Sequence, residues 1–552
     1  MLQSTGKVLR VFFFWSFVLA QLAALGRVFP ALGRRQWSFP LTIAAAAWGA
    51  CAASLLMHAL IEATSFPVFT ISSFAPIYPL LLVFIAAAFW DVISSLACPA
   101  TLPAEAVPRR QLTPPARPSP AFAHGIGSGS WPWIAGGVAL LPFLIWYRSF
   151  AELFWFGDDL FLLDQIAMMG LREWILRVFS ENFVPLFKLL WGGAALGFGG
   201  SYLAMLSLLW LTHALNAFLL CRLMQCARFP WLATAFTLVL FTLSPINLET
   251  LGWSVQWSAV LATSFLLLGL RWHEAHCDLQ SAMRWRLYLP LGLCAALSAC
   301  SFSRGVLTGP VLALALLLSV LPGGQLLPVL RRLPAAILCL LPSLVVAAAI
   351  MHFSSGNHQA LAGHWGEIGR FAASYFFLNP AHLLLGGTSL GVLTLLALGI
   401  AKISIVWGAL AWSSGRVRQL LLLLLAYDMG NALLIGIGRY HTGFLAAMSS
   451  RYQYSSLIAT LPFAGILLSA CFGHLRSLRL HRWAGACLIV GLAGYSLVGW
   501  PRALSEFIGW RGTDLRALLA APPTTDPAAK VPALEYMHVE RAKALQRTFN
   551  LH

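Results

Sequence analysis

Charged residues are scarce in this sequence. Only 10% of the 552 residues are charged, whereas 59% are hydrophobic, and a soluble domain carries roughly 25% charged residues. This scarcity excludes a soluble enzyme, an intrinsically disordered protein and a coiled coil. Because a membrane-spanning helix needs about 20 apolar residues, the chain is long enough to cross a bilayer many times.

The sequence also lacks the cysteine spacing of a metal site or a disulfide framework. None of the ten cysteines forms a Cys-x-x-Cys pair, and most lie inside apolar runs, where cysteine behaves as a small buried hydrophobic residue. His352, His358 and His364 match no recognised metal-ligand spacing. The apolar run 11–25 is followed by arginines and not by the small residues of a signal-peptide cleavage site. We therefore interpret this run as an anchor or interfacial helix and not as a cleaved signal peptide.

The net charge of +17 does not indicate nucleic-acid binding. Most of the arginines lie in short loops between apolar runs, which is the distribution that the positive-inside rule produces. Arginine greatly outnumbers lysine, as in proteins from GC-rich bacterial genomes. We therefore expect an integral protein of the bacterial inner membrane.

Composition divides the chain into four regions. Residues 1–98 hold two or three apolar stretches, and residues 99–130 are rich in Pro, Ser and Gly, which predicts a cytoplasmic linker that cannot lie in lipid. Residues 131–500 hold about eleven apolar stretches, and residues 501–552 form a short extracytoplasmic tail. The expected fold is an all-α polytopic membrane protein with extracytoplasmic loops and interfacial helices.

The loops between the apolar stretches separate into a basic and an acidic set. Crossings are expected at 131–149, 201–221, 229–243, 254–270, 287–301, 306–321, 333–351, 386–411, 420–437, 455–472 and 483–500. One set of alternate loops holds most of the arginines and is expected to be cytoplasmic. The other set comprises loops 150–200, 244–253, 302–305, 352–385 and 438–454 and the tail. It gathers most of the acidic residues, so we expect the functional site on this periplasmic side.

Two adjacent carboxylates follow the first crossing of the core. Asp158 and Asp159 lie in the run GDDLFLLDQ, and paired carboxylates at a membrane boundary are costly unless they are solvated or used. Both are candidate catalytic residues, and Asp158 is a candidate ligand for a divalent cation such as Mg²⁺ or Mn²⁺. The alternative is an aspartate cap on the helix that follows. That helix carries Trp174, Ile175 and Phe179 and is expected to lie in the interface.

Arginine on the predicted outer side runs against the positive-inside rule, so each outer arginine needs a reason. Arg304 lies at a hairpin tip, and Arg439 and Arg451 follow a later crossing. Guanidinium binds phosphate through two parallel hydrogen bonds, so an anionic ligand is one reason. The alternative is pairing with lipid headgroups or with an outer acid such as Glu249 or Glu367.

Two pairs of polar residues lie within predicted crossings. His213 and Asn216 are three residues apart, as are Asp428 and Asn431, so each pair occupies one helix face. For the first pair we favour an interhelical hydrogen-bonding role over ligand binding. A buried acid within a membrane usually indicates function, although a bond from Asp428 to Lys402 or His213 would also account for it.

Taken in order, these segments resemble the C-type (GT-C) membrane glycosyltransferases, and most closely the protein O-mannosyltransferase-like cores and their bacterial relatives. The resemblance covers about residues 131–500. It is carried by the GDDLFLL loop, the FVPLFKLLW helix, the LTHALNAFLL crossing, the SPINLETLGW turn and the SFSR hairpin. The later SSRYQY segment, which contains Arg451 and Tyr452, resembles an outer Ser-Arg-Tyr motif. Glu181 stands where relatives often carry His, and Arg304 where they often carry Lys.

The resemblance implies transfer of a sugar from a polyprenyl-phosphate or polyprenyl-pyrophosphate carrier to an extracytoplasmic protein, glycan or lipid. Asp158 or Asp159 would take the proton of the acceptor hydroxyl as its oxygen attacks the anomeric carbon. Arg304 and Arg451 would neutralise the leaving phosphate. The expected substrate-binding residues are Glu181, His213, Glu249, Arg304, Arg439, Arg451 and Tyr452.

The alternative function is that of a polytopic transporter or a flippase for lipid-linked sugars. This class would account for the many crossings and for Asp428. The sequence shows no inverted hydropathy repeat and no paired broken helices, which favours the transferase. A membrane transferase of phosphoethanolamine or acyl groups is disfavoured because no soluble catalytic domain is recognisable.

Overall fold

The computed structural model describes residues 130–179, 182–276, 285–319, 326–353, 363–380, 392–474, 481–511, 514–520, 529–531 and 534–552. The chain forms two compact units: residues 1–124 with 386–404, and residues 125–385 with 405–552. The predicted N-terminal membrane unit, residues 1–98, and nearly all of the predicted linker lie outside the described residues. The described residues form an all-α polytopic membrane protein with one short β-hairpin.

Each of the eleven predicted crossings is a helix. In chain order these helices are α4 (Trp131–Ile145), α8 (Tyr202–Cys226), α9 (Trp231–Leu243), α11 (Trp257–His276), α12 (Trp285–Ala299), α13 (Thr308–Leu318), α14 (Leu326–Phe353), α17 (Val392–Trp412), α18 (Gly415–Arg439), α19 (Gln453–His474) and α20 (His481–Val498). Within the described residues, six helices are long and apolar enough to span a membrane, or up to seven if one bent pair counts as a single span. The apolar runs therefore predicted the helices, and some of these are too short to span alone.

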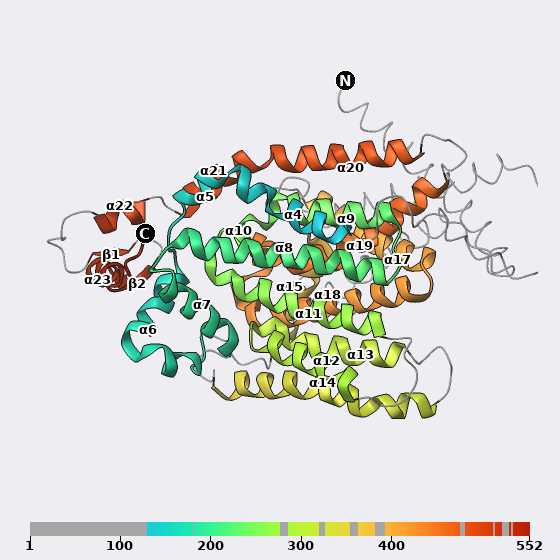
Figure 1. The fold of residues 1–552 in the computed structure, drawn as a ribbon, viewed down its shortest axis with the longest axis horizontal. Coiled ribbons are helices and arrows are strands. Elements are labelled where there is room, and N and C mark those ends of the chain that lie inside the picture. Colours follow the sequence, from blue (N-terminus) through green and yellow to red (C-terminus); the bar gives the residue numbers. More distant parts are fainter. Residues whose placement is uncertain are drawn as a thin grey trace, which may run out of the picture. The chain divides into compact units, whose positions relative to one another are not determined.

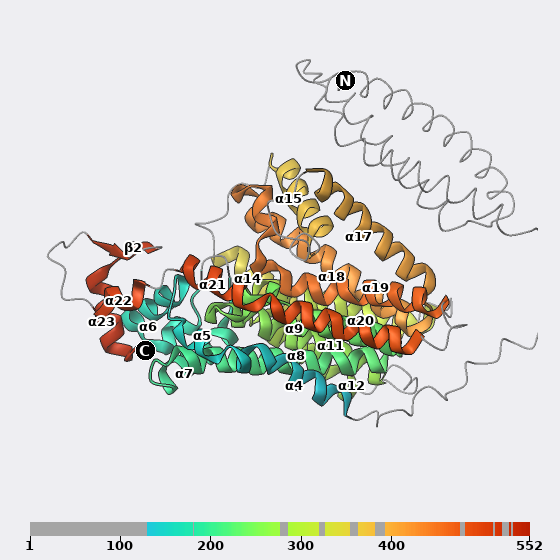
Figure 2. The ribbon, with the colours of Figure 1, turned by 90° about the horizontal axis from the view of Figure 1, so that it is seen from above.

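The long helices of the larger unit pack side by side (Figures 1 and 2). α8 packs against α4 and α11, α11 packs against α12, and α9 packs against α19 and α20. The indole of Trp210 in α8 lies 5.6 Å from the ring of Phe143 in α4 and 5.9 Å from the indole of Trp500. Dispersion between such closely packed side chains holds helices together in a membrane, where lipid removes most of the hydrophobic driving force.

Shorter elements connect the long helices. The first loop forms α5 (Tyr147–Glu152), α6 (Asp158–Ile175) and α7 (Pro185–Gly197). Later connections form η3 (Pro245–Asn247), α10 (Leu248–Leu251), η4 (Ser254–Gln256), η5 (Ser303–Leu307), α15 (Trp365–Leu378), η7 (Tyr440–Thr442), η8 (Phe444–Met448) and η9 (Ser450–Tyr452), where η denotes a 3₁₀ helix. The tail forms α21 (Trp500–Arg511), α22 (Asp514–Ala520), β1 (Lys530–Val531), β2 (Leu534–His538) and α23 (Val539–Phe549), with β1 and β2 antiparallel.

The segments that loop charge assigned to one side gather at one end of the helices. The backbone N–H of Leu186 donates to the Cys300 carbonyl at 3.0 Å, and Trp500 Nε1 donates to the Leu243 carbonyl at 2.7 Å. α6, α7, α22 and α23 also lie together at this end (left in Figures 1 and 2). These contacts bring together the first loop, the end of α12, the end of α9 and the start of α21, and the side of the membrane on which they lie stays a prediction.

In the helix expected to lie in the membrane interface, Trp174 is fully buried because α7 packs against α6. The interfacial position of this helix stays a prediction. The tail docks on the first loop and on the start of α8: the backbone N–H of Tyr202 donates to the His552 carbonyl at 3.1 Å, and Arg541 pairs with Asp164 at 2.5 Å. The expected outer loop 352–385 contains α15, which packs against α18.

Candidate functional site

Asp158 and Asp159 begin α6, and only Asp158 is partly exposed. The carboxylate of Asp159 is fully buried. Its Oδ1 accepts a hydrogen bond from Ser254 Oγ at 2.6 Å, and its Oδ2 accepts one from the backbone N–H of Phe156 at 3.1 Å. Asp159 therefore anchors the loop, and of the two carboxylates only that of Asp158 is exposed enough to meet a ligand.

Arg511 of α21 is the cation beside Asp159. Its guanidinium lies 3.9 Å from Asp159 Oδ2 and donates to the carbonyls of Gly252 at 2.7 Å and Phe154 at 2.9 Å. Burial raises the pKa of Asp159 to about 7, and Arg511 and the hydrogen bonds from Ser254 and Phe156 act in the opposite direction. Arg511 is not among the residues predicted for the site, although it is an arginine on the predicted outer side, where each arginine needs a reason.

The turn between α9 and α11 touches both the acidic loop and the later arginine segment. Ser254 holds Asp159, as described, and Trp253 Nε1 donates to the Phe156 carbonyl at 3.3 Å. A few residues earlier, Glu249 Oε2 accepts hydrogen bonds from Ser450 Oγ and from the backbone N–H of Arg451. One turn thus joins two segments that are nearly 300 residues apart in the sequence.

Arg304 and Arg451 lie beside the same aromatic ring. The guanidinium carbon of Arg304 is 5.8 Å from the ring centre of Tyr452, and that of Arg451 is 5.3 Å from it. Arg304 also lies 4.8 Å from the ring of Phe302. Cation–π contact with these rings orients the two charges without neutralising them.

Among the described residues, no carboxylate forms an ion pair with either guanidinium. Arg304 donates one hydrogen bond, to Ser455 Oγ at 3.3 Å, and the buried Nε of Arg451 has no hydrogen-bond partner. Glu249 binds the backbone N–H of Arg451 and not its side chain, while Glu367 pairs with His364 at 2.9 Å. Pairing with these two acids therefore does not explain the arginines, and an anionic ligand stays a prediction.

His213 lies apart from the arginines, in the packed interior between α8 and α19. It is fully buried, and its Nδ1 is 2.9 Å from Tyr454 Oη, which also accepts a hydrogen bond from Asn216 Nδ2 at 3.0 Å. This is the interhelical arrangement that we favoured for the pair. Arg439 ends α18 and is partly exposed, and Glu181 lies outside the described residues.

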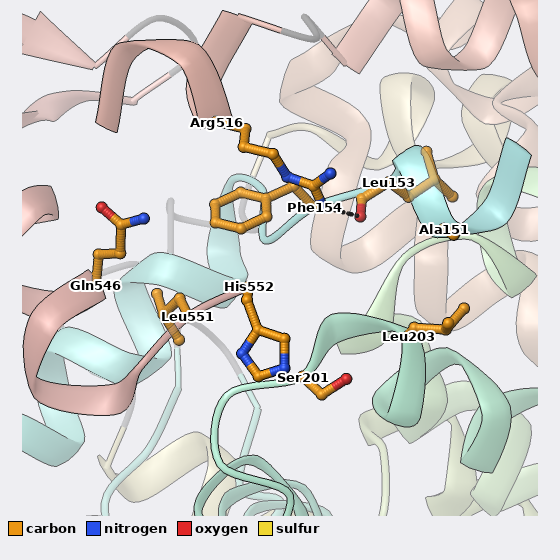
Figure 3. A pocket seen from close by; sticks show the side chains of 9 residues that line it. All are labelled: Ala151, Leu153, Phe154, Ser201, Leu203, Arg516, Gln546, Leu551 and His552. Carbon is orange, nitrogen blue, oxygen red and sulfur yellow. Dashed lines mark hydrogen bonds between the residues drawn. The ribbon is translucent and has the colours of Figure 1, made fainter. Parts of the chain in front are cut away.

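Nothing in the described residues assembles the usual ligand set of a metal. No group of three or more His, Cys, Asp or Glu side chains there is arranged to hold an ion, so a cation at Asp158 stays a prediction. A pocket of about 470 Å³ lies where the tail meets the first loop, and it is lined by Phe154, Ser201, Arg516 and His552 among others (Figure 3). None of the predicted site residues lines this pocket.

Six of the predicted site residues belong to segments that are linked by direct contacts. Asp158 and Asp159 are joined through Ser254 to the turn that carries Glu249, and Glu249 is joined to the segment of Arg451 and Tyr452. Arg304 completes this group through its contact with the Tyr452 ring. Comparison with known proteins gave no match to a family model, to a curated protein or to a solved structure.

Proposed function

We propose that this protein is a membrane glycosyltransferase. It moves a sugar from a polyprenyl-phosphate carrier to an acceptor on the periplasmic side of a bacterial inner membrane. The observation that supports this best is the pair Arg304 and Arg451, which meet at the Tyr452 ring without a carboxylate partner among the described residues. Two such guanidinium groups suit a phosphate that gains charge as it leaves.

In the proposed reaction, the Asp158 carboxylate accepts the proton of an acceptor hydroxyl. The hydroxyl oxygen attacks the anomeric carbon, and the bond from this carbon to the phosphate oxygen breaks. The products are the glycosylated acceptor and the polyprenyl phosphate, whose added negative charge lies at Arg304 and Arg451. A divalent cation, if one binds at Asp158, would add to the neutralisation of the phosphate.

Asp159 has a positioning role in this proposal. Its hydrogen bonds to Ser254 and Phe156 fix the start of α6, and Asp158 is the adjacent residue. The turn 244–256 links this start to the Arg451 segment, so the base and the anion-binding groups share one support. Fixed relative positions of base and charge matter because they lower the entropic part of the barrier.

The test is a reaction with defined components in liposomes. Purified full-length protein receives a polyprenyl-phosphate-linked hexose with a radioactive sugar, together with a membrane extract as the acceptor source. We expect release of polyprenyl phosphate and transfer of the label to the extract. Movement of the lipid-linked sugar between leaflets with no release of polyprenyl phosphate would contradict the proposal and identify a flippase.

A further inference from the structure

A buried polar cluster adjoins the two arginines. It consists of Tyr375 in α15, Asp428 and Asn431 in α18, Arg304 in η5 and Tyr452 in η9, and we call it the Tyr375 cluster. All five residues are at most 9% exposed. The Tyr375 and Tyr452 rings meet edge to face at 6.4 Å, and Tyr375 interacts electrostatically with Asp428 and Arg304.

Asn431 lies three residues after Asp428 in α18, so the two residues share one helix face. The next residue of α18, Ala432, packs in one hydrophobic cluster with Tyr375 and Tyr452. α18 also packs against η5, which carries Arg304. The Tyr375 cluster is therefore continuous with the site of the two arginines.

Several polar atoms of this cluster have no hydrogen-bond partner among the described residues. They are Tyr375 Oη and both Oδ1 and Nδ2 of Asn431. Asn431 lies within a candidate membrane span and is fully buried there. More than nine in ten buried polar groups are hydrogen-bonded in proteins, so these three atoms leave hydrogen-bonding capacity that a ligand could use. Asp428 already interacts with other groups of the protein.

The chemistry of these groups selects the class of ligand. The Asn431 amide offers two donors and an acceptor, and the Tyr375 hydroxyl offers one of each. Because both side chains are neutral, they are not suited to binding a second anion. The hydroxyl groups of a sugar both donate and accept hydrogen bonds, so they match these two side chains. The neighbouring aromatic rings supply apolar faces for the C–H groups of a sugar ring.

We infer that Tyr375 and Asn431 bind hydroxyl groups of the sugar while Arg304 and Arg451 hold the phosphate to which that sugar is attached. The inference rests on the proposed function and adds to it the residues that recognise the sugar. Tyr375 and Asn431 would then determine which sugar the protein accepts on its donor. The ring of Tyr375 contacts the ring of Tyr452, beside which the two arginines lie.

The test compares two lipids that differ only in the sugar. Calorimetric titration of the full-length protein in nanodiscs uses a polyprenyl-phosphate-linked hexose and the same polyprenyl phosphate without a sugar. Tyr375→Phe and Asn431→Leu should each weaken binding of the sugar-linked lipid about 5- to 10-fold, the effect of one lost hydrogen bond. Binding of the sugar-free lipid should not change. Tyr495→Phe, at a residue that is 71% exposed on α20, is the matched control and should change neither affinity.

Thermal unfolding of the same variants separates ligand binding from a structural role. Replacing a buried amide without partners by an apolar side chain is neutral or stabilising, so Asn431→Leu should keep or raise the melting temperature. A lower melting temperature with an unchanged preference for the sugar-linked lipid would overturn the inference and assign the cluster to packing or bound water. Equal binding of both lipids by the unmodified protein would overturn it while leaving the phosphate site intact. Binding of neither lipid would show that both the inference and the proposed function are wrong.

Discussion

The carboxylate of Glu249 accepts a hydrogen bond from the backbone N–H of Arg451 at 2.9 Å, across 202 residues of sequence. The same oxygen also accepts a hydrogen bond from Ser450 Oγ. These bonds fix the 3₁₀ helix η9 at its first residues, and the guanidinium of Arg451 is not used in them. The acid thus positions the arginine without neutralising it.

Glu249→Gln should weaken this anchor without abolishing it, because the amide oxygen still accepts one hydrogen bond but carries no charge. We expect a loss of about 1 kcal/mol in the free energy of unfolding, the difference between a charge-assisted and a neutral hydrogen bond. Donor binding should also weaken, measured as the donor concentration at half-maximal rate. Glu506→Gln removes an exposed carboxylate that pairs with Arg502 and serves as the control, with almost no effect on either quantity.

Asp158→Asn should lower turnover by about 10²–10⁴-fold, the usual contribution of a positioned base. Because asparagine has the shape of aspartate, the variant should be expressed at the level of the unmodified protein and should have the same melting temperature. Turnover is measured as release of polyprenyl phosphate at saturating donor. Near-normal turnover would remove Asp158 from the mechanism and favour its role as a helix cap.

Arg304→Ala and Arg451→Ala should each weaken donor use by about 1.5–3 kcal/mol, the value of a charge-assisted hydrogen bond. Arg304→Lys should weaken it less than Arg304→Ala, because lysine keeps the charge and loses the planar fork. The measurement is the dependence of rate on donor concentration. If both alanine variants lose thermal stability and keep their affinity for the donor, the arginines hold the loops together and their assignment to phosphate binding is wrong.

The pH dependence of stability tests the burial of Asp159. Its pKa is raised to about 7 in the folded protein from an ordinary value of 3.8, so between these values the folded state binds more protons than the unfolded state. The free energy of unfolding should therefore fall as pH rises from about 4 through 7. Asp159→Asn should flatten this part of the profile, measured by denaturant unfolding in detergent. An unchanged slope would show that Asp159 is ionised throughout the range.

Gly305→Ala should strongly destabilise the hairpin that carries Arg304. A Cβ at this position would lie 1.9 Å from the carbonyl oxygen of Ser298, which is backbone and cannot rotate away. We expect a loss of about 1–3 kcal/mol in the free energy of unfolding. Gly366→Ala, where a Cβ would meet nothing within 4 Å, should be neutral or slightly stabilising. Equal stabilities of the two variants would contradict this account of the hairpin.

The helices were predictable from the sequence. Apolar runs such as those that became α8 and α18 must satisfy their backbone hydrogen bonds internally in lipid, so run length alone predicts a helix. Arginine in alternate loops predicted which connections share an end, because charge sets orientation during insertion. The adjacent acids Asp158 and Asp159 and the outer arginines Arg304 and Arg451 were also identifiable from this pattern.

The roles of these residues depend on contacts that form only when the helices pack. Asp158 and Asp159 are equivalent in sequence, but Ser254, from a distant turn, buries one and leaves the other partly exposed. His213 and Arg304 were both candidates for ligand binding, yet the side chain of His213 meets Tyr454 of α19, while Arg304 meets Tyr452. The partners of Tyr375 lie far away in the sequence, so no local pattern identified it, whereas Arg511 was identifiable as an outer arginine but its pairing with Asp159 was not. Burial and contact depend on which helices pack together, and a local pattern of residues does not specify that.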